Sequence, residues 1–471
     1  MTVSDVIDQL GQIDPREVPP VPREPGCPVP VMPIQLSVLK RVKESKKSER
    51  RRFCTIGLRL LGPLDVPLLN RSIAEVVARH EALRTKIVEA EGVFRQHIEQ
   101  PLDHYLDVVE LQQVPPSLRE EEVQRRAHEF AEEKIDLFVG PLFAAKLFKL
   151  SDEEHVLIVA VDHIVIDGAS MGILNSEIWT VYHRAMQGLP ASLPKLCVQY
   201  GDYAVWLHKT LEVWQREHEP YWRERLSAAP CLKLPINNCP EMNAGSRLDF
   251  SFGKPLTVKL RRMARCQGAL LPVVVFAIYI SVMSRWYEKS DLLAWFVYNG
   301  RHRPELRGVI GFVAYVLNLR IEIYNDDTFL DLLKRVNLEF WLAHEHRDFG
   351  WVPHTIATPP TSDLGFNWGP GWVFGKVYGS IDGSGIRIQP FPLRKSFPGW
   401  GLASGGFGET SGEIVMHVFH DPKVISPQVM KGLGDQFVAA AHELAEHPRA
   451  PMASFLRKVS TFDPNMQLKA S

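Results

Sequence analysis

The sequence predicts a mixed α/β sandwich of the α+β class, built in two halves. The chain has 471 residues, more than a single hydrophobic core usually accommodates. Strand and helix patterns are intermixed in both halves, without the regular strand–helix alternation of a parallel sheet. Pro190 and Pro194 interrupt the pattern. We therefore expect a proline-rich lead-in at residues 1–27, an N-terminal half at 28–188 and a C-terminal half at 189–471.

The N-terminal half carries both kinds of signal. Residues 58–64 suit a strand followed by a turn, and Asp65 suits the N-cap of a helix with Pro67 in its first turn. Residues 142–150 predict another strand, and a short polar turn joins it to the apolar run 155–160. We expect these two strands to be neighbours in one sheet.

The C-terminal half continues the mixture. Helices are predicted at 256–266, 270–287 and 329–344, and from Pro427 onward with Ser426 before it. Strands are predicted at 292–297, 312–323 and 413–420, and the glycine-rich stretch 365–386 predicts strands and turns.

Composition narrows the possible functions. Hydrophobic residues make up 45% of the chain and charged residues 23%, and the net charge is −1, so no overall field favours nucleic acid or an anionic membrane. The first residues lack a signal peptide pattern, and the longest apolar stretch, 270–283, is shorter than a membrane span. The six cysteines lack the spacing of metal ligands. We expect a cytoplasmic protein without a metal site.

The most informative segment joins the apolar run 155–160 to a histidine and a turn. The run has the length and β-branched content of a strand buried on both faces. His163 lies at its end, Asp167 and Gly168 turn the chain, and a helix is expected from Ser170 onward. A histidine held in this way suits a general base in a cleft. Taken alone, the pattern is more typical of an ordinary core histidine.

Five motifs occur in order between Arg79 and Arg320. They are residues 79–85 (RHEALRT), 162–168 (DHIVIDG), 200–206 (YGDYAVW), 300–301 (GR) and 310–320 (IGFVAYVLNLR). Together they resemble the condensation domains of nonribosomal peptide synthetases, which belong to the chloramphenicol-acetyltransferase-like acyltransferases. The resemblance covers about residues 28–448. It implies two chloramphenicol-acetyltransferase-like halves that form a V-shaped pseudo-dimer.

Two positions depart from the family pattern. Asp162 stands where the family has the first histidine of its His-His-x-x-x-Asp-Gly motif, a position with a mainly structural role. An aspartate there either orients the neighbourhood or raises the basicity of His163, and it also fits a degenerate domain without catalysis. Tyr315 stands where the family usually has asparagine near the cleft. Tyr315 and Trp368 are therefore candidates for an altered acceptor pocket, with core packing as the alternative.

The resemblance also implies roles for the remaining candidates. His163 would be the catalytic residue. Asp167 would be a structural carboxylate paired with an arginine from the other half, for which Arg301 is the candidate. Gly168 would let substrate approach or adopt a positive φ, or be an ordinary turn glycine. Its amide would face the negative charge that develops on a thioester carbonyl.

By this resemblance we expect a free-standing acyltransferase, because the sequence has no carrier-attachment motif and no adenylation domain. It would transfer an acyl or aminoacyl group from the phosphopantetheine arm of an acyl or peptidyl carrier protein to a small amine or alcohol. The product would be an amide or ester in antibiotic or other secondary-metabolite biosynthesis, and the chain itself would bind no cofactor. Two alternatives stay open: a non-catalytic module that binds carrier proteins or recruits partners, and an acyltransferase that uses coenzyme A thioesters.

Overall fold

The computed structural model describes most of the chain. The described residues are 18–45, 49–50, 53–232, 246–347, 362, 364–369, 379–380, 385–393, 403–410, 412–420 and 426–459.

The chain divides into two compact units, and each contains segments that are distant in sequence. Unit 1 consists of Met1–Pro220, Asn299–Ala314 and Lys376–Leu393. Unit 2 consists of Tyr221–Tyr298, Tyr315–Gly375 and Arg394–Ser471. This division differs from the predicted boundary between residues 188 and 189. Most of α6 (Tyr200–Leu226) belongs to unit 1, and so do two later segments, because their contacts lie there.

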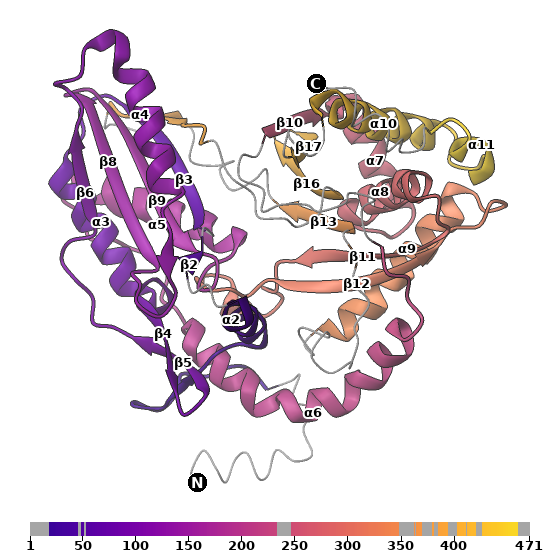
Figure 1. Cartoon of the computed structure of the whole chain (residues 1–471), viewed down its shortest axis with the longest axis horizontal. Coiled ribbons are helices and arrows are strands. Elements are labelled where there is room, and N and C mark those ends of the chain that lie inside the picture. Colours follow the sequence, from indigo (N-terminus) through magenta and orange to yellow (C-terminus); the bar gives the residue numbers. More distant parts are fainter. Residues whose placement is uncertain are drawn as a thin grey trace. The chain divides into compact units, whose positions relative to one another are not determined.

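Unit 1 is built around a six-stranded mixed sheet with the order β14-β15-β3-β9-β8-β6 (Figure 1). The strands of unit 1, including those outside this sheet, are β1 (Val29–Pro30), β2 (Glu49–Arg50), β3 (Phe53–Leu61), β4 (Thr85–Ala90), β5 (Val93–Ile98), β6 (Leu106–Glu110), β7 (Ile135–Asp136), β8 (Phe143–Ser151), β9 (Glu154–Asp162), β14 (Gly379–Ser380) and β15 (Arg387–Pro390). Its helices besides α6 are α2 (Pro33–Ser45), α3 (Val66–Arg79), α4 (Pro116–Ala131) and α5 (Gly168–Met186), with 3-10 turns at Glu81–Arg84 and Pro304–Leu306.

Helices cover both faces of the unit 1 sheet. Val156, Ile158 and Ala160 of β9 pack in one cluster with residues of α4, while α3 and α5 pack against each other on the opposite side (Figure 1). Every residue of β9 after its first is buried. The predictions that this strand is buried on both faces and pairs with β8 are therefore confirmed.

Local signals set the predicted helix ends. Asp65 is the N-cap of α3, and its side chain accepts a hydrogen bond from the Leu68 amide. Ser426 caps α10 in the same way through Val429. The helix predicted from Ser170 begins two residues earlier, at Gly168.

Unit 2 has a second six-stranded mixed sheet, with the order β10-β17-β16-β13-β11-β12. Its strands are β10 (Ser246–Ser251), β11 (Asp291–Tyr298), β12 (Tyr315–Glu322), β13 (Leu364–Gly369), β16 (Ala403–Thr410) and β17 (Glu413–His420). Its helices are α7 (Gly253–Cys266), α8 (Leu271–Tyr287), α9 (Phe329–Glu345), α10 (Pro427–Glu446) and α11 (Met452–Leu456).

Helix α8 forms the centre of the unit 2 core. Nearly all of its residues are buried, which matches its continuous apolar sequence. Within the described part of the chain, no single helix combines the length and apolar character needed to cross a membrane. Among the described helices, α7 and α8 are long and apolar enough when taken together, and they are bent by 107° at their break.

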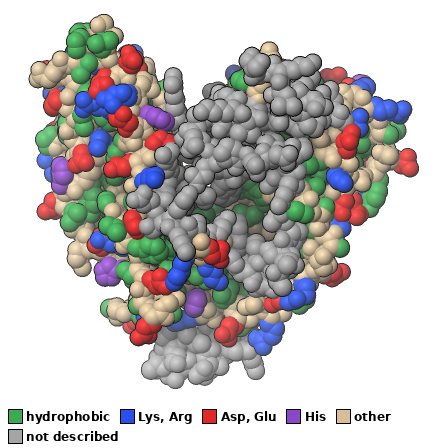
Figure 2. All heavy atoms as spheres, in the orientation of Figure 1, with side chains coloured by type: hydrophobic (Ala, Val, Ile, Leu, Met, Phe, Trp, Pro, Cys, Tyr) green, Lys and Arg blue, Asp and Glu red, His purple; other side chains and the backbone are tan. Residues whose placement is uncertain are grey.

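Acidic and basic side chains are interspersed on the described surface (Figure 2). This distribution agrees with the net charge of −1. The described residues form no extended patch of one sign on the face that Figure 2 shows.

Candidate functional site

His163 lies in the turn that follows β9, and its side chain is half-buried. Its ring centroid lies 4.5 Å from that of Phe312, which is itself buried. The preceding strand is buried from its second residue to its end, so the point at which the histidine leaves the sheet is rigidly set. A partly accessible imidazole on a rigid support can accept or position a proton.

The side chain of Asp162 is completely buried at the end of β9. Its Oδ1 accepts a hydrogen bond of 2.8 Å from the backbone amide of Ile164. The carboxylate therefore connects the residues before and after His163 and stabilises the turn that carries the histidine. The orienting role that the sequence suggested for an aspartate at this position stays a prediction.

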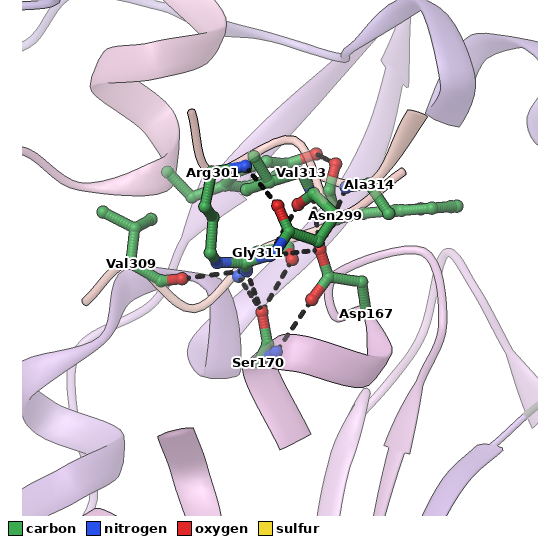
Figure 3. A network of polar contacts seen from close by, with 10 residues as sticks. Asp167, Ser170, Asn299, Arg301, Val309, Gly311, Val313 and Ala314 are labelled. Atoms are coloured by element: carbon green, nitrogen blue, oxygen red, sulfur yellow. Dashed lines mark hydrogen bonds and ion pairs between the residues drawn. The ribbon is translucent and has the colours of Figure 1, made fainter. Parts of the chain in front are cut away.

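Asp167 is the N-cap of α5, and both of its oxygens are used. Oδ1 accepts from the Ser170 amide at 2.8 Å, as expected for an N-cap aspartate. Oδ2 accepts from Arg301 Nη1 at 2.9 Å and from the backbone amides of Val313 and Ala314 at 2.9 and 3.0 Å (Figure 3). One buried carboxylate thus holds the start of α5 against the segment Asn299–Ala314.

Ser170 and Arg301 complete this network (Figure 3). Arg301 Nη2 donates to Ser170 Oγ at 2.6 Å and to the Val309 carbonyl at 3.1 Å. The Ser170 hydroxyl donates to the Gly311 carbonyl at 2.9 Å and accepts from the Gly311 amide at 3.0 Å. The pairing of Asp167 with Arg301 is as predicted. In chain order Arg301 lies between two strands of unit 2, but the segment that carries it belongs to unit 1.

The surroundings of Asp167 keep it ionised. Burial alone would raise the pKa of this carboxyl, but the guanidinium of Arg301 and the hydrogen bonds from Arg301 and Ser170 hold the pKa below its usual value. Burial raises the pKa of Tyr200 well above its usual value, and the charge of Asp167 adds to this effect. The Tyr200 hydroxyl therefore stays protonated and donates to the Phe312 carbonyl at 3.2 Å.

Gly168 is the first residue of α5 and is exposed. Its φ is not among the positive values of the described glycines, so the suggestion of a positive φ at this position is wrong. A β-carbon built on Gly168 would meet no atom within 4 Å. The fold itself does not require glycine here. A role in the approach of a substrate stays a prediction, with an ordinary turn glycine as the alternative.

Tyr315 and Trp368 lie in unit 2. Tyr315 is the first residue of β12, pairs with Tyr298 of β11 and is buried. Trp368 lies on β13, is half-buried and packs against the unit 2 core. These contacts are those of core packing, the alternative that the sequence left open. A role in an acceptor pocket stays a prediction.

The two other motifs make structural contacts in unit 1. His80 Nε2 lies 2.7 Å from Glu177 Oε2, in buried surroundings. Arg23, from the proline-rich lead-in, forms ion pairs with Glu81 at 2.9 Å and with Asp202 at 2.7 Å. These ion pairs join the lead-in, the 3-10 turn after α3 and the start of α6.

Sequence reasoning missed two residues that organise this site. Ser170 bonds Gly311 across 141 positions of sequence, and Gln35 bonds Ile164 across 129. A serine three residues after an N-cap aspartate is a weak local signal. No pattern in the sequence distinguishes Gln35.

The condensation-domain family model matches residues 28–357. This match covers more than two thirds of the 471 residues, and so the chain belongs to the condensation-domain family. The matched range includes the site described above. The prediction of the family is confirmed.

Relatives of the chain are large synthetases. A linear gramicidin synthase of Brevibacillus parabrevis is 32% identical over 356 residues, which are 74% of this chain and 7% of the synthase. Phosphinothricin tripeptide synthetase PhsC of Streptomyces viridochromogenes is 32% identical over 285 residues, which are 59% of this chain and 26% of that protein. The chain thus spans only a small part of the length of these relatives.

Solved structures share the fold. The X-domain from teicoplanin biosynthesis has a TM-score of 0.78 at 21% identity, covering 93% of this chain and 99% of that one. The first condensation domain of the calcium-dependent antibiotic synthetase has a TM-score of 0.72 at 20% identity, covering 91% and 99%. The prediction of a chloramphenicol-acetyltransferase-like fold is confirmed.

Proposed function

We propose that the chain condenses an acyl or aminoacyl group, carried as a phosphopantetheine thioester on a carrier protein, with a small amine or alcohol. The observation that carries this proposal is His163, half-buried on a turn that follows a strand buried from its second residue onward. Family membership supports it, and so does the resemblance of residues 162–168 (DHIVIDG) to the family's His-His-x-x-x-Asp-Gly motif. No metal or redox group takes part in the proposed reaction.

His163 assists the attack of the acceptor on the thioester carbonyl. Its neutral imidazole takes the proton from the attacking nitrogen or oxygen as the new C–N or C–O bond forms. The C–S bond then breaks, and the imidazolium returns the proton to the departing sulfur as phosphopantetheine thiol. Asp167 and Arg301 have a structural part in this scheme, because they hold the turn and the start of α5 in place.

Product formation from separately purified partners tests the proposal. The protein is mixed with an acyl-loaded carrier protein and a panel of amines and alcohols, and products are detected by mass spectrometry. His163→Ala is expected to lower the rate by about 10²–10⁴-fold. His183→Ala, in the last turn of α5, is the matched histidine control and should retain wild-type activity. Equal product formation by wild type and His163→Ala would refute catalysis by this residue.

A binding module is the second candidate. Asp162 replaces the first histidine of the motif, and its carboxylate is used to shape the turn. One solved relative with the same fold is an X-domain in complex with OxyB, at a TM-score of 0.78 and 22% identity. A protein of this kind would bind a loaded carrier protein with equal affinity in the wild type and in His163→Ala, and neither would form product. Comparing the rates of product formation with acyl-carrier and acyl-coenzyme A donors also decides whether the protein accepts coenzyme A thioesters as acyl donors.

A further inference from the structure

Gln35 lies on α2 and is completely buried. Its Oε1 accepts a 2.7 Å hydrogen bond from the Met32 amide, just before the helix. Its Nε2 donates a 2.7 Å hydrogen bond to the carbonyl of Ile164. Because one partner is a donor and the other an acceptor, the orientation of the amide is fixed by chemistry.

Ile164 follows His163, and side chains hold both of its backbone polar groups. Asp162 accepts from the Ile164 amide at 2.8 Å, and Gln35 donates to the Ile164 carbonyl at 2.7 Å. The first contact fixes the peptide plane between His163 and Ile164. The second contact fixes the next peptide plane. The backbone on the C-terminal side of the histidine therefore has little freedom.

Gln96 lies beside Gln35 but does not hold the turn. Its Nε2 donates to the Pro30 carbonyl at 2.8 Å, and its Oε1 lies 3.4 Å from Gln35 Nε2. Gln96 is also buried. It therefore offers a matched control, a similar buried amide whose hydrogen bonds go to Pro30 and Gln35 rather than to the turn.

We propose that Gln35 is a positioning residue that sets the direction of the His163 side chain by holding the Ile164 carbonyl. The catalytic part of this inference rests on the proposed function. Without Gln35, a buried carbonyl loses its partner and the turn relaxes to find another. A displacement of about 1 Å at a catalytic group can reduce a rate by about 10²-fold.

The experiment compares Gln35→Met, Gln96→Met and wild type with two readouts. The first is steady-state condensation, in which Gln35→Met is expected to lower kcat by about 10–100-fold with KM within about twofold. The second needs no activity: the rate at which diethyl pyrocarbonate modifies His163, followed by mass spectrometry of its peptide. Gln35→Met is expected to change that rate at least about threefold, because the accessibility of the ring follows the turn.

Gln35→Met and Gln96→Met should lower the melting temperature by similar amounts, because each removes a buried amide. Gln96→Met should leave the kinetic constants and the modification rate of His163 at wild-type values. If Gln35→Met matches Gln96→Met in both readouts, the residue is only a buried structural amide and the proposal is overturned. If wild type forms no product, the proposed function fails, but an altered modification rate in Gln35→Met still supports positioning. An unaltered modification rate in that case also overturns the positioning role.

Discussion

The carboxylate of Asp167 has two tasks at the scale of a single residue. It caps α5 as Asp65 caps α3, and it also accepts hydrogen bonds from Arg301 and two backbone amides. Asp65 has only the first task, so the two aspartates can be compared directly.

We expect Asp167→Ala to destabilise the protein by about 3–5 kcal/mol, because Arg301 is left buried without its carboxylate. Asp65→Ala should cost only about 1 kcal/mol, the usual effect of a lost N-cap. Urea unfolding of both variants provides the measurement. Equal costs would show that the ion pair with Arg301 contributes nothing beyond the cap.

The same residue predicts a pH dependence. The pKa of Asp167 is lower in the folded state than its usual value, so its stabilisation is complete above about pH 3.9, the unfolded value, and is lost as the pH falls through the folded pKa. The difference in unfolding free energy between wild type and Asp167→Asn should therefore be constant at neutral pH and shrink on acidification below about pH 4. Urea titrations from pH 7 to pH 3 measure it. A difference that grows on acidification would contradict the assigned direction.

A substitution at Gly168 distinguishes an effect on stability from an effect on activity. A β-carbon there meets nothing within 4 Å, so Gly168→Ala should leave stability unchanged or raise it by up to about 1 kcal/mol. Gly432→Ala in α10 is the matched control, since that position is equally open. If substrate passes Gly168, only Gly168→Ala will lower kcat/KM. Full activity of this variant would remove the functional reason for glycine.

At the scale of elements, the segment Asn299–Ala314 is held against the rest of unit 1 by close packing as well as by hydrogen bonds. A β-carbon on Gly311 would lie 2.2 Å from the ring of Tyr200. The Gly311 backbone cannot withdraw without breaking its two bonds to the Ser170 hydroxyl. Glycine is therefore required at this position for a steric reason.

Gly311→Ala should destabilise the protein by about 1–3 kcal/mol, because the added methyl group overpacks the contact with Tyr200. Amide hydrogen exchange should accelerate across Asn299–Ala314 and at the start of α5. Gly308→Ala is the control within the same segment, since its β-carbon would meet only the flexible end of Leu196 at 3.2 Å. If amide hydrogen exchange in Gly311→Ala is no faster than in Gly308→Ala, the Tyr200 ring can move to accommodate the added methyl group.

The elements that the sequence predicted well depend on neighbours in the chain. The N-cap at Asp65, the pairing of β8 with β9 and the buried α8 follow from patterns within a few residues. The His163 turn and the start of α5 were also found, to within two residues. The roles of Ser170 and Gln35 were not, because their partners lie more than a hundred positions away and neither residue type is unusual there.

At the scale of the whole molecule, unit 1 is not a continuous stretch of chain. The segment Lys376–Leu393 supplies β14 and β15, which pair next to β3, and Asn299–Ala314 supplies the partner of Asp167. Local periodicity cannot reveal such insertions. This explains why the predicted boundary between residues 188 and 189 differs from the division of the structure.

The discontinuity predicts that the N-terminal part will not fold by itself. A fragment of Met1–Pro220 lacks both inserted segments, so β3 loses a neighbouring strand and the buried Asp167 loses Arg301. We expect it to keep helical far-ultraviolet circular dichroism, to lose near-ultraviolet signal and to bind a hydrophobic dye. The urea unfolding transition of the fragment should be broad, whereas that of the full chain should be steep.

Two synthetic peptides, residues 299–314 and 376–393, should restore a cooperative transition when added in excess, because ligands that bind only the folded state stabilise it by mass action. Peptides of the same composition in scrambled order provide the control. A steep transition for the fragment without any peptide would show that residues 1–220 suffice for a folded unit. In that case the inserted segments contribute only to the site around Asp167, and their removal should affect condensation without affecting the fold.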